Sequence, residues 1–240
     1  MGDDPFGEAF RDYLDGKRPV LTIERDDGYM DEHDFEDYFA GFDHFPQCEK
    51  DALSLAKGRV LDIGLGAGRV SLHLQSLGLD VTGIDISDLA LETSRRRGVR
   101  KAVKMSACEL DLPKGSIDTA VAFGNNFGVC GTPEGVLGMM VRLREVVADG
   151  GTFLAESIDP TATDRQVHLE YHRRNRERGR YPGQVRIRDR YEGTVGGWWD
   201  LLMVTPDEME MLAERAGWRV QRVITEPGPG RIYVGVMVKA

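Results

Sequence analysis

A buried strand that runs directly into a glycine-rich turn and a helix constrains this chain more than any other feature. Residues 60–69 read VLDIGLGAGR, with residues suited to a buried strand followed by glycines at 64, 66 and 68. Such a junction commonly holds an adenine-bearing cofactor, because glycines let it approach the backbone and helix N–H groups lie nearby. The dinucleotide fingerprint G-x-G-x-x-G would need a third glycine where Arg69 stands. The spacing therefore favours a different cofactor, and a tight strand-to-helix connection without any ligand is the alternative.

A second predicted strand, residues 80–84, ends at Asp85. In an open α/β sheet the carboxyl ends of the strands face the ligand crevice, where an acid can accept hydrogen bonds from both hydroxyls of a ribose. Asp85 could instead cap the next helix, but Ser87 is well suited to that role. The position favours a ribose contact.

The D-x-G-x-G-x-G pattern of residues 62–68 resembles motif I of the class I S-adenosylmethionine-dependent methyltransferases, and Asp85 stands where that family binds ribose. The resemblance implies S-adenosylmethionine as cofactor and S-adenosylhomocysteine as product. The contacts it implies are Asp62 to the amino group, Gly64, Leu65, Gly66 and Gly68 to the methionine moiety, Asp85 to the ribose and Ile86 to the adenine.

Two later stretches match positions of the family more loosely. Residues 105–113 stand where many members carry an acid beside the adenine, and residues 124–128 follow the fourth predicted strand. There Asn126 is expected to face the acceptor, although a turn with local hydrogen bonds also explains the asparagines. The N-P-P-Y pattern of enzymes that methylate amino groups on nucleic acids or proteins is absent. The further cofactor residues predicted in these stretches are Ala107, Cys108, Glu109, Gly124 and Asn125.

Strands and helices alternate from residue 58 to about 156, the pattern of a parallel sheet covered on both faces. Thr205, Pro206 and Glu208 then combine an N-cap, a first-turn proline and a capping box, and two strands follow that helix. The resemblance implies a Rossmann-like, seven-stranded α/β sheet with helices on both faces and an antiparallel last strand. The strands are expected at about 59–63, 80–84, 101–106, 117–123, 152–156, 218–224 and 231–238.

Two segments lie outside this core and are expected to select the acceptor, because the common core binds the cofactor. Residues 1–57 are predicted to form a helical lid with many aromatic rings, although packing explains each ring equally well. Residues 58–240 form the methyltransferase domain, and 157–203 within it form an insertion that covers the substrate. That insertion is predicted to hold a helix at 163–178 and a hairpin of strands 184–195 and 198–204, turned by Gly196-Gly197. Alternation places Val185, Ile187 and Tyr191 on one face of the hairpin and Arg186, Arg188 and Arg190 on the other.

Charge is unevenly distributed along the chain. Residues 1–51 carry a net charge of −11, whereas residues 165–190 hold nine arginines and a net charge of +6. Three explanations remain open: two solvated faces, contact between the two segments over the active site, or a basic segment that binds an anionic substrate. The overall charge of −9 argues against nucleic-acid binding, which needs a basic surface.

Methyl transfer from a sulfonium requires little from side chains beyond positioning and removal of water. A general base is needed only where the acceptor must lose a proton, and His168 and His172 in the insertion are the predicted catalytic residues. Glu156 and Asp159, after the fifth strand, are alternatives by location. The predicted substrate-binding residues are Tyr29, Asn126, Tyr171 and Arg173.

Composition sets the remaining expectations. The 240 residues suit one domain with an insertion, and no apolar run approaches the length of a membrane span. Cys48, Cys108 and Cys130 lack a C-x-x-C pair and are predicted to be reduced thiols, with no metal site, in a cytoplasmic protein without a signal peptide. A homodimer is compatible with the sequence.

The sequence thus predicts an S-adenosylmethionine-dependent methyltransferase acting on a small molecule, with an anionic acceptor as the more specific hypothesis. Methylation of a protein or RNA is the main alternative within the fold. A nucleotide-binding module that transfers no methyl group is the alternative from another class.

Overall fold

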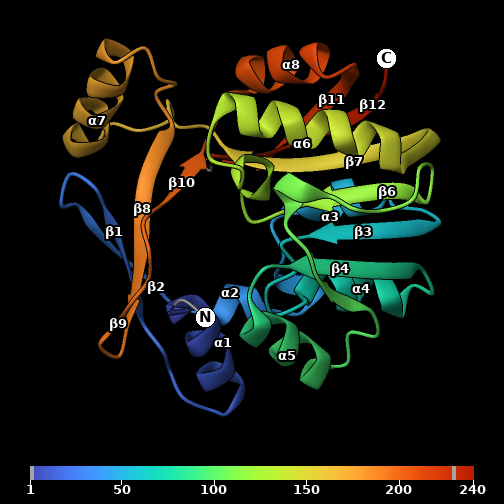
Figure 1. Ribbon diagram of the computed structural model, residues 1–240, viewed down its shortest axis with the longest axis horizontal. Coiled ribbons are helices and arrows are strands. Elements are labelled where there is room, and N and C mark those ends of the chain that lie inside the picture. Colours follow the sequence, from blue (N-terminus) through green and yellow to red (C-terminus); the bar gives the residue numbers. More distant parts are fainter. Residues whose placement is uncertain (1–2, 229–230) are drawn as a thin grey trace.

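The computed structural model describes residues 3–228 and 231–240, and two β-sheets lie side by side in it (Figure 1). The larger, here called the core sheet, has the strand order β11-β12-β7-β6-β3-β4-β5. Strands β3 to β7 are parallel, and β12 inserts antiparallel between β7 and β11. The seven strands and the antiparallel last strand confirm the predicted sheet. Their bounds are β3 Arg59–Ile63, β4 Asp80–Asp85, β5 Ala102–Lys104, β6 Ile117–Ala122, β7 Val147–Ile158, β11 Trp218–Thr225 and β12 Ile232–Lys239.

Helices cover both faces of the core sheet because neighbouring residues of its strands point to opposite faces. Leu61 packs in one apolar cluster with helices α6 and α8, whereas Val60 packs in another with α3 and α4. The predicted capping box is present, with the Thr205 hydroxyl accepting from the Glu208 N–H and the Glu208 carboxylate accepting from the Thr205 N–H. The helices are α3 Gln47–Leu53, α4 Arg69–Ser76, α5 Asp88–Arg97, α6 Pro133–Val146 and α8 Pro206–Arg215.

The second sheet, here called the roof sheet, joins the two segments that lie outside the core. Strand β8 of the insertion pairs antiparallel with both β1 and β10, β1 pairs with β2, and β9 pairs with β8. The N-terminal segment is therefore not the purely helical lid that we predicted, because its residues 21–33 form a hairpin that extends the sheet of the insertion. The bounds are β1 Leu21–Arg25, β2 Met30–His33, β8 Gln184–Tyr191, β9 Thr194–Val195 and β10 Trp199–Leu202.

The turn of the insertion hairpin was also predicted wrongly. Strand β8 turns at Glu192 and Gly193, whose φ angles of 46° and 86° are both positive, as a tight type I′ turn requires. Gly196 and Gly197 lie in the connection to β10 instead. The predicted alternation is confirmed, since Val185, Ile187 and Tyr191 are buried while the arginines between them are more exposed.

The remaining helices flank the roof sheet. They are α1 Pro5–Leu14, α2 Glu36–Phe39 and α7 Gln166–Glu177. Phe10 of α1 packs edge to face with Phe35, and Phe6 of α1 and Tyr38 of α2 lie tilted against the same ring. Within residues 3–228 and 231–240, every helix is too short or too polar to cross a bilayer.

A buried hydrogen bond ties the roof sheet to α1, because the Tyr191 hydroxyl donates to Asp12 Oδ2 over 2.8 Å. We expect Tyr191→Phe to lower the free energy of unfolding by about 2 kcal/mol, as for a hydrogen bond to a charged group. Urea denaturation measures the change. The matched control is Tyr13→Phe, since the Tyr13 hydroxyl contacts only exposed Arg18 among the described residues. Equal effects of both substitutions would contradict the role of this contact.

Candidate functional site

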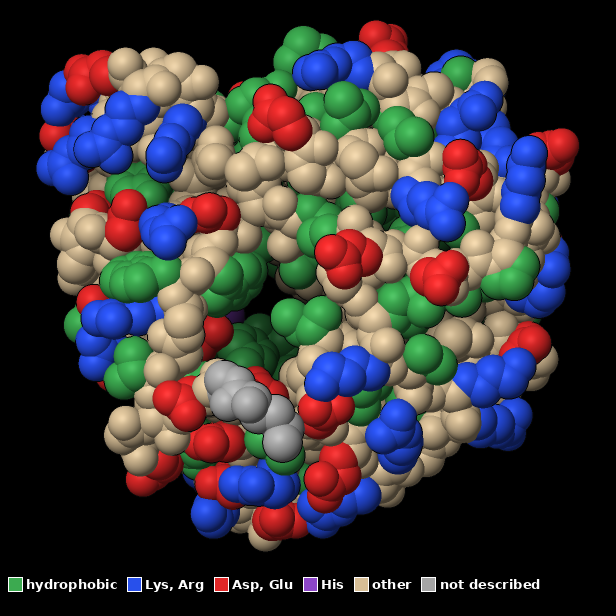
Figure 2. Space-filling model, in the orientation of Figure 1, with side chains coloured by type: hydrophobic (Ala, Val, Ile, Leu, Met, Phe, Trp, Pro, Cys, Tyr) green, Lys and Arg blue, Asp and Glu red, His purple; other side chains and the backbone are tan. Residues whose placement is uncertain are grey.

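A cavity of about 950 Å³ lies between the carboxyl edge of the core sheet and the roof sheet. Figure 2 shows the hollow that opens between these two parts of the molecule, with hydrophobic side chains on its walls. Its lining comes from the β3–α4 loop, the end of β4, the residues after β6, α1, α7 and the inner face of the roof sheet. All the segments predicted to bind the cofactor or the acceptor therefore contribute to one cavity.

The glycine-rich turn after β3 forms one wall of this cavity. Gly64 has a φ of +69°, and a Cβ there would lie 2.3 Å from the Asn126 amide nitrogen, so no larger residue fits. The Asn126 amide donates to the carbonyls of Ile63, Gly64 and Phe123, at 3.1, 3.0 and 2.7 Å. These bonds hold the turn after β3 against the turn after β6.

Two carboxylates lie beside the glycine turn. Asp85 accepts from the N–H of Gly66 at 3.0 Å and from that of Ser87 at 2.9 Å, and burial raises its pKa. Asp62 is buried and accepts from the Ser71 hydroxyl at 2.6 Å. Burial raises the pKa of Asp62 to about 6, against the opposing effects of Ser71 and Arg69. Both groups line the cavity, so a cationic or hydroxylated ligand would meet two acceptors there.

Most of the predicted cofactor residues line the cavity, and two do not. Gly68 begins α4, where a Cβ would meet Val99 at 2.6 Å, and Glu109 is exposed outside the lining. Those that the structure brings together are Asp62, Gly64, Leu65, Gly66, Asp85, Ile86, Ala107, Cys108, Gly124 and Asn125.

Glu156, an alternative candidate for the base, holds the loop after β6 through a hydrogen bond. Its Oε1 accepts from the Asn125 N–H at 3.1 Å, and the residue lies outside the cavity lining. Burial, reinforced by nearby Glu49, raises its pKa well above the ordinary value. Asp159, the other alternative, accepts from the N–H and hydroxyl of Thr161 and is also outside the lining. Neither carboxylate reaches the cavity in this arrangement.

Both predicted catalytic histidines line the cavity at the end formed by α7. Arg25 Nη1 lies 3.2 Å from His168 Nδ1, and Arg25 is itself held by two 2.8 Å bonds to the Asp27 carboxylate. Burial lowers the pKa of His168, and nearby Arg25 lowers it further. Burial also lowers the pKa of His172, to about 4. Both rings are therefore neutral at pH 7.

The four predicted substrate residues separate into two pairs. Tyr29 and Asn126 line the cavity, whereas Tyr171 and Arg173 do not. The Tyr171 ring is buried against the roof sheet, with its hydroxyl donating to Asp26 at 2.7 Å. Arg173 is exposed on α7 and pairs with Glu170 and Glu177 of the same helix.

Among the charged residues of the lining that were not predicted from the sequence are Arg165, Arg231 and Asp189. Asp189 shares the inward alternation of β8 with Val185 and Ile187, and an acid on an otherwise apolar face was the available signal. Its Oδ2 accepts from Trp199 Nε1 at 3.2 Å, and burial raises its pKa. Arg165, the N-cap of α7, lies three residues before His168 and seven before His172, spacings that place all three on one helical face.

Comparisons with known proteins give this arrangement a family. Residues 60–151 match the model of a methyltransferase domain. A SAM-dependent methyltransferase from Bacteroides fragilis, solved with S-adenosyl-L-homocysteine, superimposes with a TM-score of 0.83 at 25% identity, covering 99% of this chain and 95% of that one. The chain therefore contains a methyltransferase domain and has the fold of S-adenosylmethionine-dependent methyltransferases. The predicted cofactor class is thereby confirmed.

Other relatives of this methyltransferase are more distant or match over a shorter segment. The CcbJ methyltransferase from Streptomyces caelestis shares the fold, with a TM-score of 0.62 at 18% identity over 84% of this chain and 99% of that one. A ubiquinone biosynthesis O-methyltransferase from Bordetella avium is 42% identical over 52 residues, which are 22% of each chain. The match thus spans about a fifth of that curated relative.

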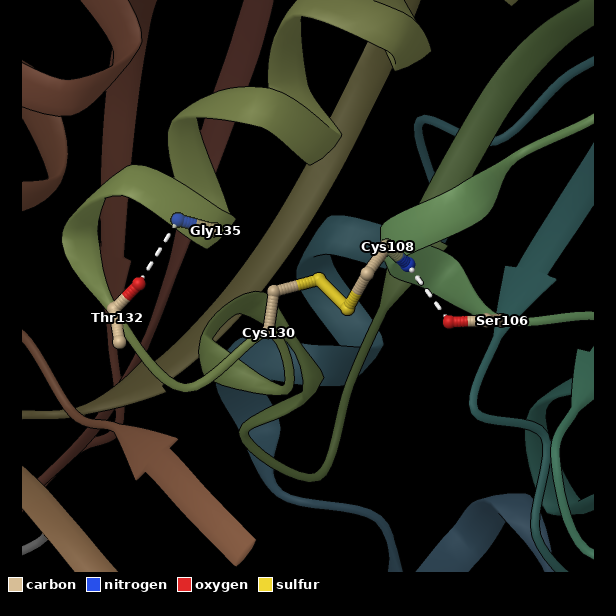
Figure 3. The surroundings of a disulfide bond; sticks show 5 residues. All are labelled: Ser106, Cys108, Cys130, Thr132 and Gly135. Atoms are coloured by element: carbon tan, nitrogen blue, oxygen red, sulfur yellow. Dashed lines mark hydrogen bonds between the residues drawn. A yellow bond between two sulfur atoms is a disulfide. The ribbon is translucent and has the colours of Figure 1, made fainter.

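The cysteines of the methyltransferase differ from the prediction of three reduced thiols. Cys108 and Cys130 form a disulfide (Figure 3), with their Cα atoms 5.7 Å apart. Cys48 is a buried free thiol. The bond joins the short helix at 107–109 to the turn before α6, and both cysteines line the cavity. The prediction failed because these residues, 22 positions apart, meet only when the two loops fold over the sheet edge. A cytoplasmic location loses the support it drew from reduced cysteines.

We expect one reactive thiol, Cys48, when the methyltransferase is denatured without reductant and labelled with a maleimide. Mass spectrometry after reduction should show three. In Cys130→Ser, two thiols should react without reductant, because Cys108 loses its partner. Three labels on the unreduced wild-type protein would show that the disulfide does not form.

Proposed function

We propose that this protein transfers the methyl group of S-adenosylmethionine to a small-molecule acceptor that carries an anionic group. The observation behind the proposal is that one cavity is lined both by the glycine turn and by two arginines that form no ion pair with any described residue. Its volume of about 950 Å³ suits two small ligands together. The chain's own roof sheet covers the site, and this arrangement favours a small acceptor over a protein or RNA.

We assign the cofactor to the wall formed by β3, β4 and the glycine turn. Asp85 is placed to accept from the ribose hydroxyls, and Ile86 beside it is an exposed apolar surface for the adenine. Only Ser71 among the described residues donates to Asp62, onto Oδ2, which leaves Oδ1 for the cofactor's ammonium group. These acceptors fit the cationic and hydroxylated parts of S-adenosylmethionine, which supplies an electrophilic methyl group when bound.

Asp62 makes cofactor affinity depend on pH. With a pKa of about 6, its carboxylate is ionised at pH 7 and takes up a proton as the pH falls, and the neutral acid attracts an ammonium group less. We therefore expect the dissociation constant for S-adenosylhomocysteine to rise about tenfold for each pH unit below 6. Calorimetry between pH 5 and 8 measures the change.

Two variants control this pH experiment. Asp62→Asn should bind weakly and lose the transition near pH 6. Ser71→Ala should move the transition to higher pH, since the Ser71 hydroxyl lowers the pKa of Asp62. Affinity that is constant from pH 5 to 8 in the wild-type protein would contradict the assignment of Asp62.

The anionic group is inferred from Arg165 and Arg231. Both line the cavity, and neither forms an ion pair with any described residue. The other arginines of the basic segment lie outside the lining, and Arg188 and Arg190 pair with Glu24. A guanidinium that faces a cavity without a partner is suited to a carboxylate or phosphate.

We expect the double substitution Arg165→Gln/Arg231→Gln to weaken binding of benzoate to the S-adenosylhomocysteine complex at least tenfold, because it removes two charge-assisted contacts. Benzamide, the neutral counterpart, should bind weakly to both proteins. Affinity for S-adenosylhomocysteine should not change. Arg173→Gln, which removes an exposed arginine of the same segment, is the matched control. Equal binding of benzoate and benzamide by the wild-type protein would contradict an anionic acceptor.

A further inference from the structure

The contact between Arg25 and His168 determines which ring nitrogen of His168 carries a proton. A guanidinium has only donors, so Arg25 Nη1 must donate over the 3.2 Å that separate it from His168 Nδ1. Nδ1 is then the unprotonated nitrogen, and in the neutral ring the hydrogen is on Nε2. His168 has no free lone pair in this arrangement. It therefore cannot take a proton from an acceptor without losing Arg25.

Arg25 is fixed in this position from several sides. The Asp27 carboxylate holds it with two bonds, and the Val167 carbonyl accepts from its Nη2 at 3.2 Å. Its guanidinium lies over the rings of Tyr29 and Tyr171, 4.8 and 4.1 Å from their centroids. Because the guanidinium cannot lose its proton or turn away, the tautomer of His168 is set by the fold.

The Nε2 side of the His168 ring remains for a ligand. The ring lines the cavity, and no described residue accepts a hydrogen bond from Nε2. Arg165 and Arg231 line the same end, and Tyr29 packs edge-on against the ring at 5.1 Å. The charged or titratable groups that act on the ring are Arg25, Arg165, Arg231 and His172 on the cationic side and Asp31 on the acidic side.

We propose that His168 is a neutral hydrogen-bond donor whose Nε2–H, oriented by Arg25, fixes the anionic group of the acceptor between Arg165 and Arg231. The inference rests on the proposed function, and it makes His168 a specificity-determining residue and not a base. A hydrogen bond from a neutral donor is directional, whereas the two arginines attract an anion by charge. Together these groups select the position of the anion as well as its charge. Arg25 is the positioning residue, since it acts through His168.

The tautomer is tested on the wild-type protein without any substrate. Nitrogen-15 NMR of histidine-labelled protein should show His168 Nδ1 as a pyridine-type nitrogen and Nε2 as a pyrrole-type nitrogen at pH 7. His168 should take up a proton at a lower pH than an exposed histidine does, because burial lowers its pKa. A protonated Nδ1 at pH 7 would overturn the inference, whatever the protein methylates.

Binding of benzoate to the S-adenosylhomocysteine complex tests the role of the donor. His168→Leu should bind benzoate about tenfold more weakly, and His168→Gln, whose amide can donate, should recover most of that loss. Affinity for S-adenosylhomocysteine should be unchanged in both. Unaltered benzoate affinity in His168→Leu would contradict the inference alone. Failure of the wild-type protein to prefer benzoate over benzamide would instead contradict the anionic acceptor of the proposed function.

Discussion

Pairing between β1 and β8 is the interaction on which the closed cavity depends. The register runs from Thr22 opposite Arg190 to Arg25 opposite Ile187, so an N-terminal hairpin becomes part of a sheet whose other strands come from the insertion between β7 and α8. A two-stranded hairpin alone is marginally stable, and unpaired backbone groups at a buried edge are costly. Each segment therefore needs the other. Only their joint sheet faces the carboxyl edge of the core sheet, where the cofactor turn lies (Figure 1).

The same pairing explains the uneven charge of the sequence. Glu24 on β1 lies between Arg188 and Arg190 on β8, and burial of Tyr171 brings its hydroxyl to Asp26. The acidic and basic segments thus contact each other, one of the three explanations that the sequence left open. An anionic substrate would need arginines other than those that pair with the acidic segment. The structure separates the paired arginines from the arginines that line the cavity. Those on the outer face of β8 pair with Glu24 in the roof sheet, whereas Arg165 and Arg231 line the cavity.

The core could be predicted because its signals are local. Each strand and helix carries its own apolar pattern and cap, and the turn at Gly64 excludes any residue larger than glycine. The roof sheet could not be predicted, because the residues of a strand do not indicate which distant strand it pairs with. On α7 the error at Arg173 was one of helical phase. Arg173 follows His168 by five residues and His172 by one, so a count of 3.6 residues per turn places it on a different face. Tyr171 follows His168 by three residues, and only the packing of α7 on the roof sheet separates its ring from the cavity.

Helix α1 links the two ends of the cavity physically. A Cβ at Gly66 would lie 3.2 Å from the Phe10 ring, so α1 sits directly on the cofactor turn, and Tyr191 ties the same helix to the roof sheet. Burial around the cavity also shifts the pKa of titratable groups at both ends. Burial raises the pKa of Asp62 at one end and lowers that of His172 at the other. Each shift disfavours the charged form of its group.

For the proposed reaction this environment has a consequence. A sulfonium loses its positive charge when its methyl group leaves, so a site that disfavours isolated charge favours the products over the bound reactants. An anionic acceptor group would be poorly tolerated in the same cavity without fixed partners. Arg165, Arg231 and the His168 donor provide such partners away from the glycine turn. Burial beside the glycine turn thus favours the proposed transfer, and fixed partners such as these are what the proposed anion would need for binding.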